Sequence, residues 1–229
     1  MNIVLFIIPN FLSIPSDSNF ILLRIINFSV IKMGLISIDP FILSGLRFLL
    51  CALPLVFFIK KPNVHIKYII AYGLIFGIGL WGMVTLGIYL GVSAGVASLV
   101  LQISVFLTII MGGIILKESI DIYKKIAFIV ALFGLGLILS VTDGSITIVG
   151  LIFVLIGVFS WSIANIIIKI AKIKEIFSFL IWSSLFSPIP LFILAYLTNG
   201  SIVYINFFEH LDNKAIFSIL FQEKPYFYP

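Results

Sequence analysis

The chain has 229 residues, of which 62% are hydrophobic and 10% charged, with 14 basic and 9 acidic residues and a net charge of +5. Soluble domains average about 45–50% apolar and about 25% charged residues, so this composition excludes an ordinary soluble domain. The single cysteine excludes a disulfide framework, and the lysines lie between apolar runs rather than in one basic patch. The sequence therefore predicts an all-α, polytopic membrane protein that binds no nucleic acid.

The apolar runs set the number of helices. Residues 1–19 are predicted to be an irregular lead-in, because Pro9 and Pro15 interrupt any helix there. A bilayer core about 30 Å thick requires roughly 20 apolar residues in a helix. Seven stretches come close to the required length, at approximately residues 20–36, 40–59, 68–90, 94–116, 125–141, 147–168 and 176–197. One further apolar run, which begins at Ala215, ends after about eight residues and is too short to span the bilayer.

Lysines alternate from loop to loop. Nine of them fall in the loops after the second, fourth and sixth spans, whereas the loops around Asp39, Gly91, Asp143 and residues 198–213 hold no Lys or Arg. Because cytoplasmic loops are enriched in Lys and Arg, the lysine-bearing loops and the N-terminus are predicted to be cytoplasmic. The nine residues are Lys60, Lys61, Lys67, Lys117, Lys124, Lys125, Lys169, Lys172 and Lys174.

Two short patterns recur along the chain. The segment NFSVIK in the first span is similar to NIIIK in the sixth, and Leu53-Pro54-Leu55 is similar to Ile189-Pro190-Leu191. Since the copies are an odd number of helices apart, they would insert in opposite orientations. Inverted repeats are typical of secondary transporters, which bind substrate near the membrane midplane between the two halves.

Longer segments resemble the EamA family of the drug/metabolite transporter superfamily, and within it the bacterial exporters of cysteine and O-acetylserine. The segments are NFSVIKMGL, PFILSGLRFLL, YLGVSAGVASLVLQISVFLTIIMGGIILKE and GVFSWSIANIIIK. The resemblance runs from about Asn27 to about Leu220, and its most specific part is Ala94 to Gln102 followed by Lys117-Glu118. It implies two inverted repeats of five helices each, acting as a proton-linked or passive exporter of small metabolites.

The resemblance also divides the chain into parts. The first repeat would occupy residues 20–141, an incomplete second repeat residues 142–222, and a tail outside the family residues 223–229. The family continues for three helices beyond the seventh, so the chain is expected to be shortened there. We therefore expect residues 1–229 alone to leave the cavity open on one side and not to transport. The alternative is a homodimer in which each chain supplies what its partner lacks.

Five residues inside the predicted spans are candidates for binding substrate. Polar groups are costly in lipid unless paired, so we expect these side chains to face one central cavity. For Gln102 a helix–helix hydrogen bond is the alternative, and for the residues of the sixth span a purely structural role also stays open. The five are Asn27 in the first span, Trp81 in the third, Gln102 in the fourth, and Trp161 and Asn165 in the sixth.

Charged residues near the spans receive mostly structural interpretations. Arg47 is expected to extend outward to the lipid headgroups, with attraction of substrate carboxylates as the alternative. Lys169 is expected to anchor the cytoplasmic end of its helix. Glu118 is expected to be solvated or to pair with Lys124 or Lys125. No acidic residue lies inside a complete span, so the commonest proton carrier is missing.

These patterns favour a multi-pass transporter of the bacterial inner membrane. It would export small polar, amino-acid-like metabolites such as cysteine or O-acetylserine by alternating access, with the lipid bilayer and the metabolite as its partners. The alternative is a truncated, transport-inactive remnant of such an exporter. An enzyme is disfavoured, because His65 and His210 are predicted on opposite sides and no acidic pair shares a depth. No catalytic residue, metal ligand or cofactor is predicted.

Overall fold

The computed structural model describes residues 30–118, 121–140, 146–209, 216 and 218–219, and every regular element in these ranges is helical. The lead-in, most of the first predicted span and Asn27 lie outside the described residues. The described elements are Pro40–Val56 (α4), Ile66–Leu74 (α5), Ile75–Gly82 (η1, a π-helix), Met83–Tyr89 (α6), Ala94–Leu101 (α7), Ile103–Ile115 (α8), Ile122–Ser140 (α9), Ile148–Ile170 (α10), Ile176–Ser184 (α11), Pro188–Asn199 (α12) and Ile202–Glu209 (α13).

Several of these elements follow one another directly and form longer apolar rods. By length and composition, four rods could cross a membrane, namely Ile66–Tyr89, Ala94–Ile115, Ile148–Ile170 and Ile176–Asn199. The shorter helix α4 is also apolar. The fold class is therefore the predicted one, an all-α membrane bundle. Six of the seven predicted spans overlap the helices named above, and the first overlaps the helical residues 30–34.

The helix α13 corrects one expectation, because residues 198–213 were predicted to be a loop. Its run of eight residues is too short to span a bilayer, which is why span counting passes over it. The helix packs against α12 instead. Val203 is buried, and the hydroxyl of Tyr204 donates a hydrogen bond of 2.6 Å to the carbonyl oxygen of Phe192.

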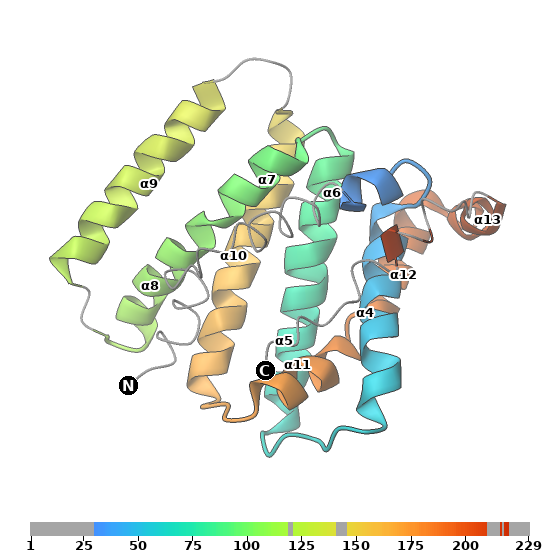
Figure 1. Ribbon diagram of the computed structural model, residues 1–229, viewed down its shortest axis with the longest axis horizontal. Coiled ribbons are helices and arrows are strands. Elements are labelled where there is room, and N and C mark those ends of the chain that lie inside the picture. The colour runs from blue at the N-terminus through green and yellow to red at the C-terminus, as the bar shows by residue number, and fades with distance from the viewer. Residues whose placement is uncertain (1–29, 119–120, 141–145, 210–215, 217, 220–229) are drawn as a thin grey trace, which may run out of the picture.

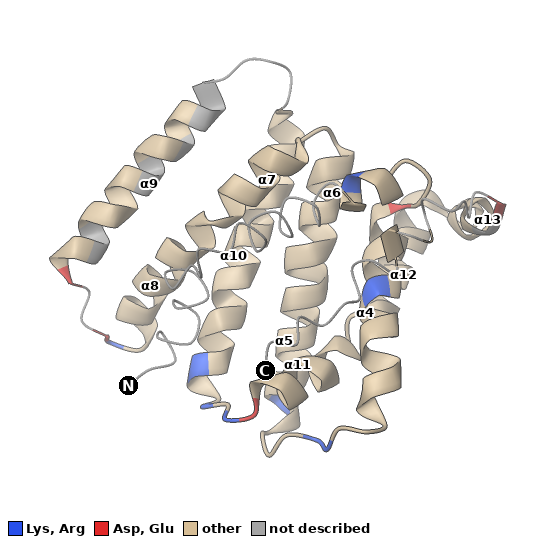
Figure 2. Cartoon of the chain, viewed as in Figure 1, with Lys and Arg blue, Asp and Glu red and all other residues tan. Residues whose placement is uncertain are grey.

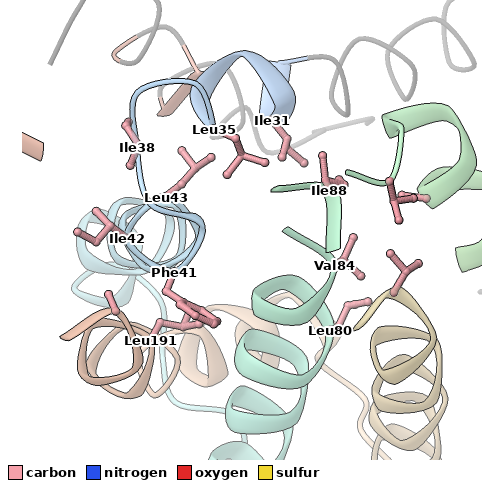
Figure 3. Close-up of a cluster of buried hydrophobic side chains, with 14 of the residues drawn as sticks. Ile31, Leu35, Ile38, Phe41, Ile42, Leu43, Leu80, Val84, Ile88 and Leu191 are labelled. Carbon is pink, nitrogen blue, oxygen red and sulfur yellow. The ribbon is translucent and has the colours of Figure 1, made fainter. Parts of the chain in front are cut away.

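The rods stand side by side, with α10 in the middle (Figure 1). One side of α10 packs against η1 and α6, and the other side packs against α7 and α8. Beyond the third span lies α4, which contacts η1, α6, α11 and α12. A cluster of buried side chains joins these layers (Figure 3). Leu80 and Val84 lie against α10 next to Gly157, whereas Phe41 of α4 and Leu191 of α12 lie against the opposite side of the third span, next to Gly82.

Glycines allow the third span and α10 to approach closely. A Cβ atom added at Gly87 would lie 2.7 Å from the carbonyl oxygen of Gly150, and one at Gly157 would lie 2.5 Å from a methyl group of Val84. Contacts this short leave no space for a side chain, as in other small-residue helix interfaces of membrane proteins. Gly87 in the third span and Gly157 in α10 therefore serve helix packing.

Most of the described basic residues gather at one end of the bundle, and one basic segment lies near the start of α4 at the other end (Figure 2). At one end, here called the lysine end, lie the loops with Lys60, Lys61, Lys117, Lys172 and Lys174. At the other end, Asp39 caps α4. Its carboxylate accepts hydrogen bonds from the backbone N–H groups of Phe41 and Ile42, and Pro40 supplies the first helical residue.

Candidate functional site

Three of the four long rods have irregular backbone near their middle. The π-helix η1 interrupts Ile66–Tyr89, Gln102 separates α7 from α8, and residues 185–187 separate α11 from α12. In contrast, α10 is uninterrupted over 23 residues. At membrane depth, irregular backbone is tolerated where it is buried in protein or lines a cavity, and interrupted helices form the substrate sites of many transporters. The middle of the bundle is therefore the candidate site.

The break in the seventh span follows from its prolines. Pro188 lacks a backbone N–H group and begins α12. The hydroxyl of Ser187, which is fully buried, donates a hydrogen bond of 2.8 Å to the carbonyl oxygen of Gly73. The break is thus fixed against α5 by a specific contact.

Arg47 lies near the middle of α4 and contacts the ring of Trp81. Its guanidinium carbon is 4.0 Å from the ring centroid, the geometry of a cation–π interaction. The prediction that Arg47 extends to the lipid headgroups is therefore wrong. The physical reason is that α4 packs against η1 and α6, so this face of α4 lies inside the bundle.

Two buried hydroxyl groups accompany this pair. The hydroxyl of Ser44 donates to that of Thr85 over 3.1 Å, and the hydroxyl of Thr85 donates to the carbonyl oxygen of Trp81 over 2.6 Å. We refer to Ser44, Arg47, Trp81 and Thr85 as the mid-span polar cluster. Cys51, the single cysteine of the sequence, follows Arg47 by one helical turn on α4 and is partly buried.

Gln102 lies at the junction between α7 and α8. Its side-chain carbonyl oxygen Oε1 is buried and accepts no hydrogen bond from the residues that the structure describes. A buried acceptor without a partner costs about 1–3 kcal/mol, so such groups in native proteins call for an explanation. One explanation is a solute that donates to this oxygen when it binds.

A second polar region joins α8 to α10. The amide nitrogen of Asn165 donates to the hydroxyl of Thr108 over 3.3 Å, and Thr108 donates to the carbonyl oxygen of Ser104 over 2.7 Å. The hydroxyl of Ser162 donates to the same carbonyl oxygen over 3.0 Å. We refer to this row of contacts, together with the ion pair that follows it, as the α8–α10 seam.

The ion pair of the seam lies at the lysine end. The ammonium group of Lys169 is 2.9 Å from the Glu118 carboxylate, and the two side chains are 11% and 47% exposed, respectively. Glu118 was expected to be solvated or to pair with Lys124 or Lys125, whose side chains lie outside the described residues. The partner is a lysine 51 positions away, because α8 and α10 end side by side.

The structure places the predicted site residues in different surroundings. Trp81 contacts Arg47, Asn165 lies in the α8–α10 seam, and Gln102 lies at a helix break. Trp161 is partly buried against the same apolar cluster as Trp81. Since Asn27 lies outside the described residues, the convergence of all five on one cavity stays a prediction.

Sequence reasoning missed the polar partners of these residues. Ser44 and Thr85 were not singled out, although each lies one turn from a predicted or charged candidate. Ser104 and Thr108 follow each other at the four-residue spacing that puts two side chains on one helix face, which is a signal available in the sequence. For Arg47, the position in the middle of an apolar span gave only the alternative interpretation, attraction of substrate carboxylates, although a charge at that depth usually faces the protein interior.

Comparisons with known proteins agree with this description. The model of the EamA-like transporter family matches residues 24–140. The chain is 32% identical over 202 residues to a protein of Escherichia coli named "Probable amino-acid metabolite efflux pump", covering 86% of this chain and 68% of that protein. A protein of the same name in Salmonella typhimurium is 31% identical over 204 residues, again covering 86% and 68%. The "Uncharacterized transporter YoaV" of Bacillus subtilis is 28% identical over 179 residues, covering 72% and 60%. No solved structure matches the chain.

Proposed function

Because this chain belongs to the EamA-like transporter family and is a multi-pass membrane transporter, we propose that it exports small polar, amino-acid-like metabolites such as cysteine and O-acetylserine. The proposed transport is by alternating access between inverted repeats at residues 20–141 and 142–222. The family and the names of the relatives indicate a transporter rather than an enzyme.

The observation that carries the substrate class is the contact between Arg47 and Trp81. A charged side chain in the middle of a membrane-spanning helix is costly and marks substrate pathways by default. The planar guanidinium group matches a carboxylate with two parallel hydrogen bonds, and it retains its charge inside the bundle. In this proposal Arg47 binds the carboxylate of the solute, and the ring of Trp81 holds the guanidinium group in place.

The other predicted site residues complete the proposed site. The unpaired Oε1 of Gln102 would accept a hydrogen bond from an N–H group of the solute. Trp161 would provide a second aromatic wall. At 3.3 Å, the hydrogen bond between Asn165 and Thr108 is longer than the usual range, so Asn165 could exchange it for a solute partner. Asn27 would contribute from the first span.

The orientation in the membrane is also part of the proposal. The lysine-bearing loops lie together at one end of the bundle, which supports a cytoplasmic location for that end and for the N-terminus (Figure 2). With this orientation, Asp39, Tyr89 and Asn199 lie at the periplasmic end of a bacterial inner membrane.

An export assay tests the proposal. Cells that express residues 1–229 should release more cysteine and O-acetylserine than cells with the empty vector. Arg47→Gln should lower this release at least about tenfold, whereas Arg47→Lys should retain part of it, because the charge remains but the two-pronged geometry is lost. Lys172→Gln, a charge change at the lysine end, is the control.

Membrane abundance and thermal stability of each variant should be measured in parallel. Release above the vector level would support the proposal and contradict the transport-inactive alternative. Release at the vector level by a stably inserted chain would overturn the proposal and favour the transport-inactive alternative.

A further inference from the structure

A cavity of about 290 Å³ lies at the end of the bundle opposite the lysine end. It is formed where the turn before α4, the last residue of α6, the end of α12 and α13 meet. Figure 3 shows Leu35 and Ile38 on this turn, above the start of α4. We call this cavity the Asp39 pocket. Its polar lining consists of Ser37, Asp39, Tyr89, Asn199 and Asn206.

The carboxylate of Asp39 is held by neutral donors. Its Oδ1 accepts from the backbone N–H groups of Phe41 and Ile42 at 2.8 and 3.2 Å, and its Oδ2 accepts from the side-chain amide of Asn199 at 2.8 Å. Within the described part of the chain, the ion pair is at the opposite end, between Lys169 and Glu118. The negative charge of Asp39 is thus oriented by three hydrogen bonds from neutral donors, and no ion pair joins it to a described cation.

The surroundings of this carboxylate are only partly solvated. Burial raises the pKa of Asp39, and its hydrogen bonds from Ile42, Phe41 and Asn199 oppose that change. Burial, together with the charge of Asp39, also raises the pKa of Tyr204 on the adjoining helix α13. A partly desolvated anion of this kind favours a cation beside it, because the attraction is screened less than in water.

The size and lining of the pocket decide which cation fits. The volume is far larger than the roughly 30 Å³ that a water molecule occupies, and it lies near the lower limit of small-molecule sites, about 300 Å³. A single carboxylate is a poor ligand set for a divalent ion, and the described residues hold no group of three His, Cys, Asp or Glu. Val203 and Phe207 provide an apolar wall for an organic stem.

We propose that the Asp39 pocket binds the primary ammonium group of a small amino-acid-like solute, with the Asp39 carboxylate as its counter-ion and Asn199 and Asn206 beside it. The solute class rests on the proposed function. Asp39 precedes Arg47 by eight residues, about 12 Å along α4, so the pocket is a second site rather than part of the mid-span polar cluster.

Three matched probes separate the two sites. S-methylcysteine has both charged groups, 2-(methylthio)ethylamine lacks the carboxylate, and 3-(methylthio)propanoate lacks the ammonium group. Their binding to the full chain in lipid nanodiscs should be measured by calorimetry. Asp39→Asn removes the charge and keeps an oxygen that caps α4, since Asn and Asp cap helices about equally well. The matched control is Asp121→Asn, because exposed Asp121 likewise accepts from a backbone N–H group at the start of a helix.

We expect Asp39→Asn to weaken binding of the two amines about tenfold, and to leave binding of the propanoate within about twofold. Asp121→Asn should change none of the three affinities. Equal affinities of wild type and Asp39→Asn for the amine, or no amine binding to the wild type, would overturn the pocket assignment whatever the export assay shows. If amine binding depends on Asp39 but the cells show no export, only the transport proposal fails.

Discussion

The α8–α10 seam and the mid-span polar cluster both place polar side chains inside the membrane-spanning part of the chain, but they satisfy these groups differently. In the seam, Ser162 and Thr108 share a carbonyl oxygen, Asn165 donates to Thr108, and Lys169 pairs with Glu118. In the cluster, the charge of Arg47 faces an aromatic ring. The comparison separates polar contacts that join two helices from a charged side chain that lies against an aromatic ring.

The backbone follows the same division. The helix α10 is continuous, and its glycines fit closely against α6. The other long rods are irregular near the positions of Trp81, Gln102 and Ser187. We infer that α10 and its contacts form the rigid part of the bundle, whereas the irregular segments contain the groups that respond to a solute.

The largest effect is expected where α6 meets α10. Gly87→Ala should lower the free energy of unfolding by about 1–3 kcal/mol, because the added methyl group would press on the backbone of Gly150. Gly136→Ala in α9 is the control, since a Cβ there meets nothing within 4 Å and alanine favours a helix. Unfolding in detergent would measure both. Equal stabilities of the two variants would show that α10 is not the rigid part.

Gln102 lies at an irregular segment outside the α8–α10 seam, so its replacement tests the second half of this comparison. Gln102→Met should raise the free energy of unfolding by roughly 1 kcal/mol, because it removes a buried acceptor that has no partner. The same variant should lower export if this oxygen binds the solute. Ser98→Ala, which changes an exposed hydroxyl on the same helix, is the control. A loss of stability in Gln102→Met would mean that the glutamine has a structural role.

A double-mutant cycle sharpens the description of the seam. Thr108→Val and Asn165→Leu, alone and together, should give a coupling energy of about 0.6 kcal/mol, the average for hydrogen bonds between membrane helices. The four stabilities can be measured by unfolding in detergent. A coupling energy near zero would indicate that Asn165 does not join the helices, and would favour a role in binding solute.

Like Gln102, Asp39 lies outside the α8–α10 seam. Its replacement is expected to change the free energy of unfolding the least. Because the pKa of Asp39 is raised in the folded protein, this carboxyl group contributes stability that is present below its ordinary pKa of 3.8 and lost as the pH rises through the folded-state pKa. At neutral pH, Asp39→Asn should therefore stabilise the fold slightly, and the difference should shrink towards about pH 4. Melting curves at both pH values would reveal it, and a destabilised variant at neutral pH would contradict it.

The helices themselves could be predicted from the sequence, because a lipid environment requires long apolar segments and the requirement is local. The helix breaks were harder. Proline revealed the break before Pro188, but the π-helix η1 and the break at Gln102 contain no proline and depend on packing against α10 and its neighbours. Local sequence patterns do not specify such contacts.

The candidate site shows the same limit. The spacing in α10 predicted that Asn165 faces the protein interior, and it is 9% exposed. Its partner Thr108 could not be named, since 57 residues separate the two. The environment of Arg47 was predicted wrongly for a related reason. Helical spacing says which residues share a face of α4, but not whether that face meets lipid or η1.

Cys51 gives the bundle a built-in reporter. It is the only thiol in the sequence, and it lies one turn from Arg47 on the helix that also begins at the Asp39 pocket. A maleimide or a spin label will therefore attach at a single position without prior removal of other cysteines. The rate at which it reacts, with and without solute, would follow how water reaches the inside of the bundle from each face of the membrane.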